Sequence, residues 1–370
     1  MADRQERLIS EAIAARFAAA GAVLVEADFL LPAETLLDLY GEDIRARAYI
    51  SVDPLRGEVM LRPDFTVPVV EQHMSGGAEP AIYAYSGPVF RKQEKAGPRP
   101  AEFYQAGIEI FRRDAPEVAD TRVFIMIDEA LRSLGLRLRP VIGDIGILMA
   151  AVRGLNTTEA RKTALLRHIW RPKRFRALLD RFSGRAPQPA ARLALLEKLG
   201  QGSASDLIDQ AGNFTGLRSA AEITARIDQL KLDADAAPIA APEAALLYDL
   251  LSLEAPAEAA LQHLRGITSM LPAIAPAVDR FAARLEALRA EGIDTASLAF
   301  EASHGRTTLE YYDGFVFSFL ADDPALPPVA SGGRYDALTK VLGQAQGKSI
   351  PAVGGVIRAG LVARLQEAKA

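Results

Sequence analysis

The sequence contains no cysteine and only four histidines, which stand far apart. Without cysteine, the chain has no disulfide, no thiolate metal site and no cysteine nucleophile. The histidines form neither an HxH nor an HExxH spacing, which argues against a zinc enzyme. These residues are His73, His168, His263 and His304. We therefore expect no metal and no other cofactor.

Long hydrophobic runs are also missing, and so is a strong charge of either sign. No stretch is long and apolar enough to span a membrane. The N-terminal "MADRQERLISEAIAARF" mixes acids and bases with apolar residues at helical spacing, which is typical of an amphipathic helix rather than a signal peptide. A formal net charge of -4 offers no global attraction for nucleic acid. We therefore expect a cytoplasmic protein with neither a membrane nor a nucleic acid as its partner.

The remaining composition is that of an ordinary globular protein, with 49% hydrophobic and 24% charged residues. Its 370 residues suit two domains, or one domain with a large insertion. In the first part of the chain, "ARAYISVDPLRGEVMLRPD" predicts a hairpin, and "AIYAYSGPVFRKQ" and "AEFYQAGIEIFRR" predict two more strands. Helices are predicted at "FTVPVVEQHM" and at "DAPEVADTRVFIMIDEALRSLG", the latter with Asp114 as its N-cap and Pro116 in its first turn.

From about Met149 to Arg265 the sequence is rich in alanine, leucine and arginine and carries little strand signal. The strand pattern returns near "ASLAFEAS" and ends in a Gly-rich turn into a last helix. We therefore predict an α+β fold around an antiparallel sheet flanked by helices. Its core domain comprises residues 1–148 and 266–370, and an all-helical insertion occupies residues 149–265.

The stretch "HGRTTLEYYDGFVFSFL" has Asp313 and Gly314 between two alternating apolar runs, which predicts a hairpin with a two-residue type I′ turn. Pairing outward from that turn opposes Tyr312 to Phe315. It places Glu310 on the same face of the sheet as Tyr312. A carboxylate beside a phenol is typical either of an ordinary sheet surface or of one wall of a binding site.

Two further stretches offer polar groups. In "MLRPDFTVP", Asp64 could receive a cationic amine, or it could cap the helix that begins at Thr66. "FRKQEKAGPRPAEFYQAGIE" contains a basic loop, which could hold phosphates or could be a solvated hairpin tip. On its second strand Gln105 and Glu109 point the same way, and Gly107 between them suggests a pocket floor.

The stretch "RHIWRPKRFRALLDRFSGR", from Arg167 to Arg185, interleaves aromatic residues with arginine. This pattern admits RNA binding. It also fits the polar face of a helix pair, which is the interpretation that we favour. In that case the inward-facing residues are Ile169, Trp170, Phe175, Leu178 and Leu179.

Five blocks occur in an order that resembles one family. "MLRPDFT", "FRKQEKAGPRPAEFYQAGIE", "LEYYDGFVF", "SGGRYDAL" and "PAVGGVIRAGL" are similar to the class II aminoacyl-tRNA synthetase motifs and the histidine-specific motifs of histidyl-tRNA synthetase. The resemblance implies the synthetase-like antiparallel sheet, interrupted by the helical insertion. It also implies a histidine-binding pocket, whose residues here match Asp64, Thr66, Gln105, Glu109, Tyr311 and Tyr312.

The departures from the synthetase pattern concern the nucleotide. Thr307 stands where the family has an arginine that neutralises charge during attack on ATP, and Leu361 stands where an arginine clamps ATP. The Glu-Arg pair of the second motif is replaced by Gln93 and Glu94. Arg91 and Arg99 remain and would form a vestigial phosphate site. Since losing one such cation commonly costs about 10² to 10³ in rate, the resemblance implies that adenylation is lost.

The chain also stops soon after the closing motif, where a synthetase continues into an anticodon-binding domain. These features together resemble the ATP phosphoribosyltransferase regulatory-subunit family. That family implies a non-catalytic homodimer within a hetero-octamer with the short-form catalytic subunit, acting in the first step of histidine biosynthesis, with L-histidine as a feedback effector. The alternatives are an amino-acid-activating enzyme like histidyl-tRNA synthetase, and an RNA-binding paralogue.

Overall fold

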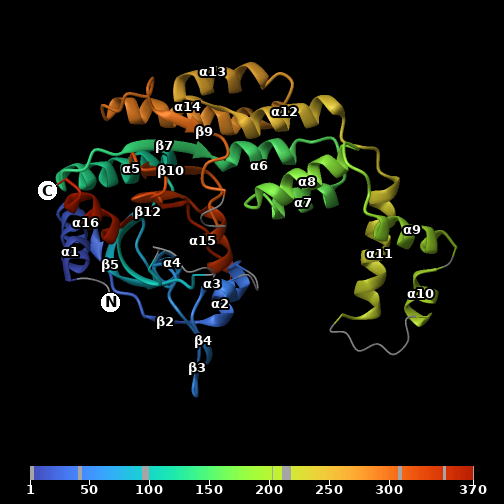
Figure 1. Ribbon diagram of the computed structural model, residues 1–370, viewed down its shortest axis with the longest axis horizontal. Helices are drawn as coiled ribbons and strands as arrows, with labels where there is room; N and C mark the ends of the chain where they lie inside the picture. The colour runs from blue at the N-terminus through green and yellow to red at the C-terminus, as the bar shows by residue number, and fades with distance from the viewer. Residues whose placement is uncertain are drawn as a thin grey trace. The chain divides into compact units, whose positions relative to one another are not determined.

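The protein forms two compact units in the computed structural model (Figure 1). The core unit comprises Met1–Ile147, Ser252–Ile267 and Ala275–Ala370, and the helical unit comprises Leu148–Leu251 and Thr268–Ile274. The structure describes residues 4–40, 44–93, 100–201, 203–210, 218–306, 311–344 and 347–369. Within these ranges, no helix combines the length and apolarity that a membrane span requires.

The core unit is built on a nine-stranded sheet, and this confirms the predicted α+β class. Neighbouring strands are antiparallel except in two parallel pairs, β1 with β5 and β7 with β9. In spatial order the strands are β1 (Val23–Leu24), β5 (Ala81–Phe90), β6 (Glu102–Phe111), β12 (Ala352–Arg358), β11 (Ala330–Arg334), β10 (Phe315–Leu320), β7 (Arg139–Asp144), β9 (Ala299–Glu301) and β8 (Glu254–Pro256).

A second, three-stranded sheet contains the hairpin that the sequence predicts. Its order is β2 (Leu30–Pro32), β4 (Gly57–Leu61) and β3 (Ile50–Asp53). Asp53 pairs with Gly57, and its Oδ1 accepts hydrogen bonds from the backbone N–H groups of Leu55 (2.8 Å) and Arg56 (3.0 Å). This side chain holds the tip of the turn. The predicted helix after it is α4 (Thr66–Met74).

Three helices pack against β5, β6 and β12 of the large sheet: α1 (Arg4–Ala19), α5 (Pro116–Ser133) and α16 (Ala359–Glu367). The Phe124 ring of α5 lies 5.5 Å from the Phe317 ring and 5.0 Å from the Phe319 ring. Pro116 begins α5 as predicted, but the expected cap at Asp114 is wrong. The N-cap is Ala115, at φ 48, and makes no side-chain capping bond. The core unit also contains α2 (Ala33–Tyr40), α3 (Ile44–Arg47), α13 (Ala257–Ile267), α14 (Ala275–Ala290) and α15 (Asp336–Leu342).

A buried ionic network ties these helices to the sheet. Arg284 on α14 donates to Asp120 on α5 (2.9 Å) and to Asp144 on β7 (2.8 Å). Arg334 on β11 donates to the other oxygen of Asp120 (2.6 Å) and to Asp336 on α15 (3.0 Å). Since the Asp120 side chain has no exposed surface, its charge depends on these two arginines.

The predicted hairpin at Asp313 and Gly314 is wrong. Strand β10 begins at Phe315, and its two partners are β7 and β11, so Phe315 lies opposite Asp144 of β7 rather than opposite Tyr312. Neither turn residue has the positive φ that a type I′ turn requires.

The Asp313 side chain makes long-range contacts instead. It accepts hydrogen bonds from the backbone N–H groups of Asp336 (3.1 Å) and Ala337 (2.6 Å), at the start of α15. Tyr311 and Tyr312 therefore precede the strand instead of forming half of a hairpin. Glu310, which was expected to share a face with Tyr312, lies outside the described residues.

The chain enters the helical unit within α6 (Ile145–Arg153). The unit then contains α7 (Glu159–Arg167), α8 (Pro172–Phe182), α9 (Ala190–Gln201), α10 (Ala204–Gln210), α11 (Ala220–Asp235) and α12 (Ala241–Ser252). Buried Arg161 on α7 donates to Asp233 on α11 (2.5 Å) and so joins two of these helices.

The C-terminal border of the helical block differs from the expected one at residue 265. The chain leaves the helical unit after Leu251, residues 252–267 belong to the core unit, and Thr268–Ile274 belong to the helical unit again. The reason is the short strand β8, which pairs with β9, together with α13, which packs on α14. A three-residue strand next to a helix leaves no recognisable pattern in the sequence.

Candidate functional site

One face of the large sheet carries the candidate site, and the strand register brings its residues together. Glu109 on β6 lies opposite Gly354 on β12, which lies opposite Gly333 on β11. Paired residues point to the same face of a sheet, so side chains at both glycines would crowd this row. A Cβ on Gly354 would come within 1.5 Å of Glu109 Oε2, and one on Gly333 within 2.8 Å of the Tyr312 ring. The glycines therefore let Glu109 and Tyr312 lie across the sheet.

Glu109 is the centre of the hydrogen bonds at this site. Its Oε1 accepts from the Thr66 hydroxyl (2.9 Å) and from the Tyr85 hydroxyl (2.9 Å), and its Oε2 accepts from the Tyr335 hydroxyl (2.5 Å). The residue is 1% exposed. A carboxylate has about four acceptor positions, so these hydroxyls leave about one for another donor.

Burial raises the pKa of Glu109 to about 7, and the charge of Asp64 raises it too. The hydrogen bonds from Tyr335, Thr66 and Tyr85 oppose this shift because they stabilise the ionised form. Near neutral pH the Glu109 carboxyl is therefore present in both protonation states.

Asp64 fills one of the two roles that its sequence context allows, the one at the start of α4, while its binding of a cationic amine stays a prediction. Its Oδ1 accepts a hydrogen bond from the backbone N–H of Thr66 at the start of α4 (3.1 Å). It is also buried, and its charge acts on Glu109 and on the tyrosines around it. Two buried carboxylates so close together repel each other, which favours a cation between them.

Tyrosines enclose these acids. The Tyr311 hydroxyl donates to Thr66 Oγ1 (3.3 Å), and the Tyr311 ring lies 4.9 Å from the Tyr312 ring and 5.9 Å from the Tyr335 ring. Burial, followed by the charges of Glu109 and Asp64, raises the pKa of Tyr312 far above its ordinary value. The Tyr312 phenol therefore stays neutral and can hydrogen-bond a ligand.

Gln105 is fully buried on the same face, opposite Arg358 of β12. Neither its amide nitrogen nor its amide oxygen has a hydrogen-bond partner within the described part of the chain. An unsatisfied buried polar group costs about 1–3 kcal/mol, so this amide needs a partner that the protein itself does not supply.

The structure brings together all six residues that were predicted to bind histidine, and it adds two that were not predicted. We call the whole group the polar cage. Tyr85 could have been found from its position opposite Gly107 on the neighbouring strand, and Tyr335 from the "GGRYD" block. The cage comprises Asp64, Thr66, Tyr85, Gln105, Glu109, Tyr311, Tyr312 and Tyr335.

The floor expected at Gly107 is occupied. A Cβ there would come within 2.4 Å of the Tyr85 ring, so that ring takes the room that the glycine leaves. Gly107 thus positions a tyrosine of the polar cage, and it does not open a space for a ligand.

The predicted phosphate site is only partly described. Arg91 Nε donates to the backbone oxygen of Pro63 (2.8 Å), directly before Asp64, and its guanidinium lies 5.6 Å from the Phe103 ring. Arg99, Glu94 and Thr307 lie outside the described residues. Leu361, at the position of the ATP-clamping arginine, lies on α16.

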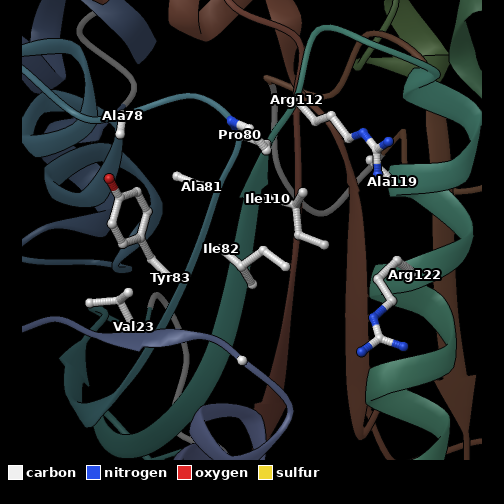
Figure 2. A pocket seen from close by; sticks show the side chains of 11 residues that line it. Val23, Ala78, Pro80, Ala81, Ile82, Tyr83, Ile110, Arg112, Ala119 and Arg122 are labelled. Carbon is white, nitrogen blue, oxygen red and sulfur yellow. The ribbon is translucent and has the colours of Figure 1, made fainter.

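A separate pocket of about 430 Å³ lies over β5 and β6. Figure 2 shows Arg112 and Arg122 at one side of it and Tyr83 at the other. Ile82 and Ile110 line its floor. Ile82 directly precedes Tyr83, which pairs with Glu109, and Ile110 directly follows Glu109. Since neighbouring residues of a strand alternate in direction, this floor is on the opposite face from the polar cage.

A family model for histidyl-tRNA synthetase matches residues 1–255 and 228–358. The ATP phosphoribosyltransferase regulatory subunit of Allorhizobium ampelinum is 34% identical over 356 residues, which cover 91% of this chain and 92% of the relative. The corresponding protein of Rhizobium rhizogenes is 32% identical over 363 residues, which cover 92% of each chain.

The fold agrees with these relatives. A crystal structure of an ATP phosphoribosyltransferase regulatory subunit/histidyl-tRNA synthetase from Bacillus halodurans superimposes with a TM-score of 0.67 at 21% identity, covering 97% of this chain and 78% of that one. The chain therefore belongs to the family of ATP phosphoribosyltransferase regulatory subunits and has the class II fold of the histidyl-tRNA synthetases.

Proposed function

We propose that this protein binds L-histidine in the polar cage and passes that signal to the catalytic subunit of ATP phosphoribosyltransferase, without catalysing a reaction itself. The observation that carries the proposal is Gln105, a fully buried amide whose two polar atoms have no partner among the described residues. A free amino acid supplies both a donor and an acceptor for such an amide.

The acids of the cage support an amino acid with cationic and N–H groups. Asp64 and Glu109 are buried close enough for their charges to interact, and Glu109 has about one acceptor position left. An ammonium or imidazole N–H would fill that position and reduce the repulsion between the two carboxylates. Histidine can shift the equilibrium between two states of the assembly only if it binds one state more tightly than the other.

The rest of the assembly follows the family resemblance. In this proposal the chain is a cytoplasmic homodimer within a hetero-octamer that contains the short-form catalytic subunit, and it acts in the first step of histidine biosynthesis. The names of the relatives support the partnership with the phosphoribosyltransferase. Thr307 and Leu361, in place of two ATP-binding arginines, support the absence of adenylation.

Calorimetric titration with histidine tests the site. Gln105→Met removes the amide at nearly constant volume, so we expect binding to weaken at least tenfold while the free energy of unfolding stays equal or rises. Gln72→Met, at an exposed position on α4, is the matched control and should change neither quantity. Unchanged histidine affinity in Gln105→Met would exclude the polar cage as the sensor.

Capture experiments test the partnership. We expect the immobilised protein to retain the catalytic subunit and to raise its turnover, and we expect histidine to lower that turnover. The same preparation should show no histidine-dependent exchange of pyrophosphate into ATP. Such exchange would identify an amino-acid-activating enzyme and would contradict the proposal.

A further inference from the structure

The helical unit carries a concentrated positive charge where α7 meets α8. We call this group the basic corner, and it consists of Arg167, His168, Arg171, Lys173, Arg174 and Arg176. A tight turn forms it, since the His168 N–H donates to the Leu165 oxygen (3.1 Å) and the Arg171 N–H to the His168 oxygen (2.9 Å). Figure 1 shows the two helices next to each other, in agreement with their contacts.

The fold of the helix pair does not depend on these cations. Ile169, Phe175 and Leu179 are completely buried and make the apolar contact between the helices. The basic residues occupy the other face of α8, where Lys173, Arg174 and Arg176 are exposed, and Arg167 is exposed at the end of α7. The predicted helix pair is thereby confirmed for three of its five inward-facing residues, whereas Trp170 and Leu178 are only partly buried. The exposed charges of the pair remain to be explained.

No acid neutralises the exposed cations. Within the described ranges of the chain, Arg167, Lys173, Arg174 and Arg176 form no ion pair and no side-chain hydrogen bond. Asp180 is the acid one turn after Arg176, but it accepts a hydrogen bond from the Tyr248 hydroxyl (2.5 Å) instead. The four charges therefore face solvent together.

Two features make this arrangement unfavourable for the isolated helices. Lys173 and Arg174 lie in the first turn of α8, where the positive end of the helix dipole favours acids. Arg171, Arg174 and Arg167 all surround His168, whose pKa is lowered first by partial burial and then by these three charges. Positions at which a sequence departs from such preferences, here for acids at a helix N-terminus and against clustered like charges, are expected to be functional.

We propose that the basic corner is the docking surface for an acidic surface of a protein partner. The proposal rests on the proposed function, in which that partner is the catalytic subunit. Complementary charges speed association and select the partner, which would account for uncompensated cations on an otherwise acidic chain.

A protein partner fits the corner better than a nucleic acid. Of the three aromatic residues interleaved with the arginines, Phe175 and Phe182 are buried and unable to stack on bases, and Trp170 is partly buried. The chain as a whole has a formal net charge of -4, which repels a long polyanion but not a local acidic patch.

The test is the association rate of the full-length protein with the catalytic subunit, measured by surface plasmon resonance at low and high salt. A variant that replaces four cations with glutamine should associate about tenfold more slowly at low ionic strength, and the difference should vanish near 1 M salt, where screening extends to only about 3 Å. Its histidine affinity should equal that of the wild type. The four substitutions are Arg167→Gln, Lys173→Gln, Arg174→Gln and Arg176→Gln.

A charge-matched control removes four exposed cations elsewhere in the helical unit and should associate like the wild type: Arg153→Gln, Lys198→Gln, Arg218→Gln and Arg226→Gln. If the corner variant associates as fast as the control, the corner is not the docking surface, while the proposed function stands. If the wild type does not bind the catalytic subunit at all, the proposed function itself fails. A third outcome is that the wild type and the control bind an RNA hairpin in a salt-sensitive way and the corner variant does not. This result would show that the corner binds nucleic acid, and it would overturn the proposal of a protein partner.

Discussion

The polar cage and the basic corner hold charge in opposite ways. In the cage, two acids are buried among hydroxyl donors, and burial, with a smaller contribution from the charge of Asp64, raises the pKa of Glu109 to about 7. In the corner, Arg167, Lys173, Arg174 and Arg176 are exposed, and none of these four forms an ion pair with an acid of the described residues. A buried charge affects stability and binding together, because removing it changes the packing and solvation of its neighbours. An exposed charge affects association while leaving stability nearly constant.

The largest effect on stability is expected in the buried ionic network. Asp120→Ala leaves Arg284 and Arg334 buried without their shared carboxylate, which should cost about 3–5 kcal/mol and lower Tm by on the order of 10 °C. Calorimetry of Arg132→Ala, which breaks an exposed ion pair on the same helix, provides the control. Equal losses in both variants would remove the distinction between buried and exposed charge.

The next effect is the pH dependence of Glu109. Its folded-state pKa lies above the unfolded value of 4.5, so the protonated form stabilises the fold at low pH, and this contribution disappears as pH rises through about 7. Between pH 4 and pH 8 the wild type should therefore lose about 3 kcal/mol more than Glu109→Gln does. Urea denaturation of both proteins at the two pH values measures the difference.

That comparison has a built-in control. Asp313 also has a pKa raised to about 7 by burial, but both proteins contain it, so its contribution cancels. If the two proteins show the same pH dependence, Glu109 does not titrate as its burial indicates.

Within the cage, smaller effects on histidine affinity should follow the chemistry that each group offers. Asp64→Asn removes one of the two negative charges that favour a cation, and we expect about tenfold to a hundredfold weaker binding. Tyr312→Phe removes only a neutral hydroxyl and should weaken binding about fivefold. Calorimetric titration that left the affinity unchanged in both variants would place the histidine site elsewhere.

The smallest effect on stability is expected in the basic corner. Lys173→Glu places an acid in the first turn of α8 and should stabilise the fold by about 0.5 kcal/mol. The same substitution should slow association with the catalytic subunit, so stability and binding would move in opposite directions. Guanidinium denaturation and the association rate measure the two effects, and loss of stability would show that Lys173 has a structural role.

Much of the fold followed from local patterns. The turn from Asp53 to Gly57, the helix after Asp64 and the long strand pair β5 and β6 all depend on residues near one another in sequence. Period two along β6 was enough to place Gln105 and Glu109 on one face.

The predictions that were wrong or incomplete concern places where segments distant in sequence determine the local structure. Asp313 with Gly314 has the composition of a type I′ turn, but the carboxylate binds N–H groups of α15 more than twenty residues later. Tyr335 reaches Glu109 only because of the register of strands β6, β12 and β11, of which β6 is far from the other two in sequence. Single-sequence patterns do not contain that register.

The path of the chain around β7, β9 and β8 has a consequence for how such proteins diversify. The chain leaves the core unit after β7 and re-enters it at β8, and only β9 lies between these two strands in the sheet. With a spacing of about 4.8 Å between strands, the exit and the return are roughly 10 Å apart. A long segment whose two ends lie this close, as those of Leu148–Leu251 do, can lengthen, shrink or be exchanged at little cost in loop entropy, while the short segment Thr268–Ile274 of the same unit is retained. This main segment of the helical unit is thus free to evolve at its own rate, while the sheet that holds the polar cage stays the same.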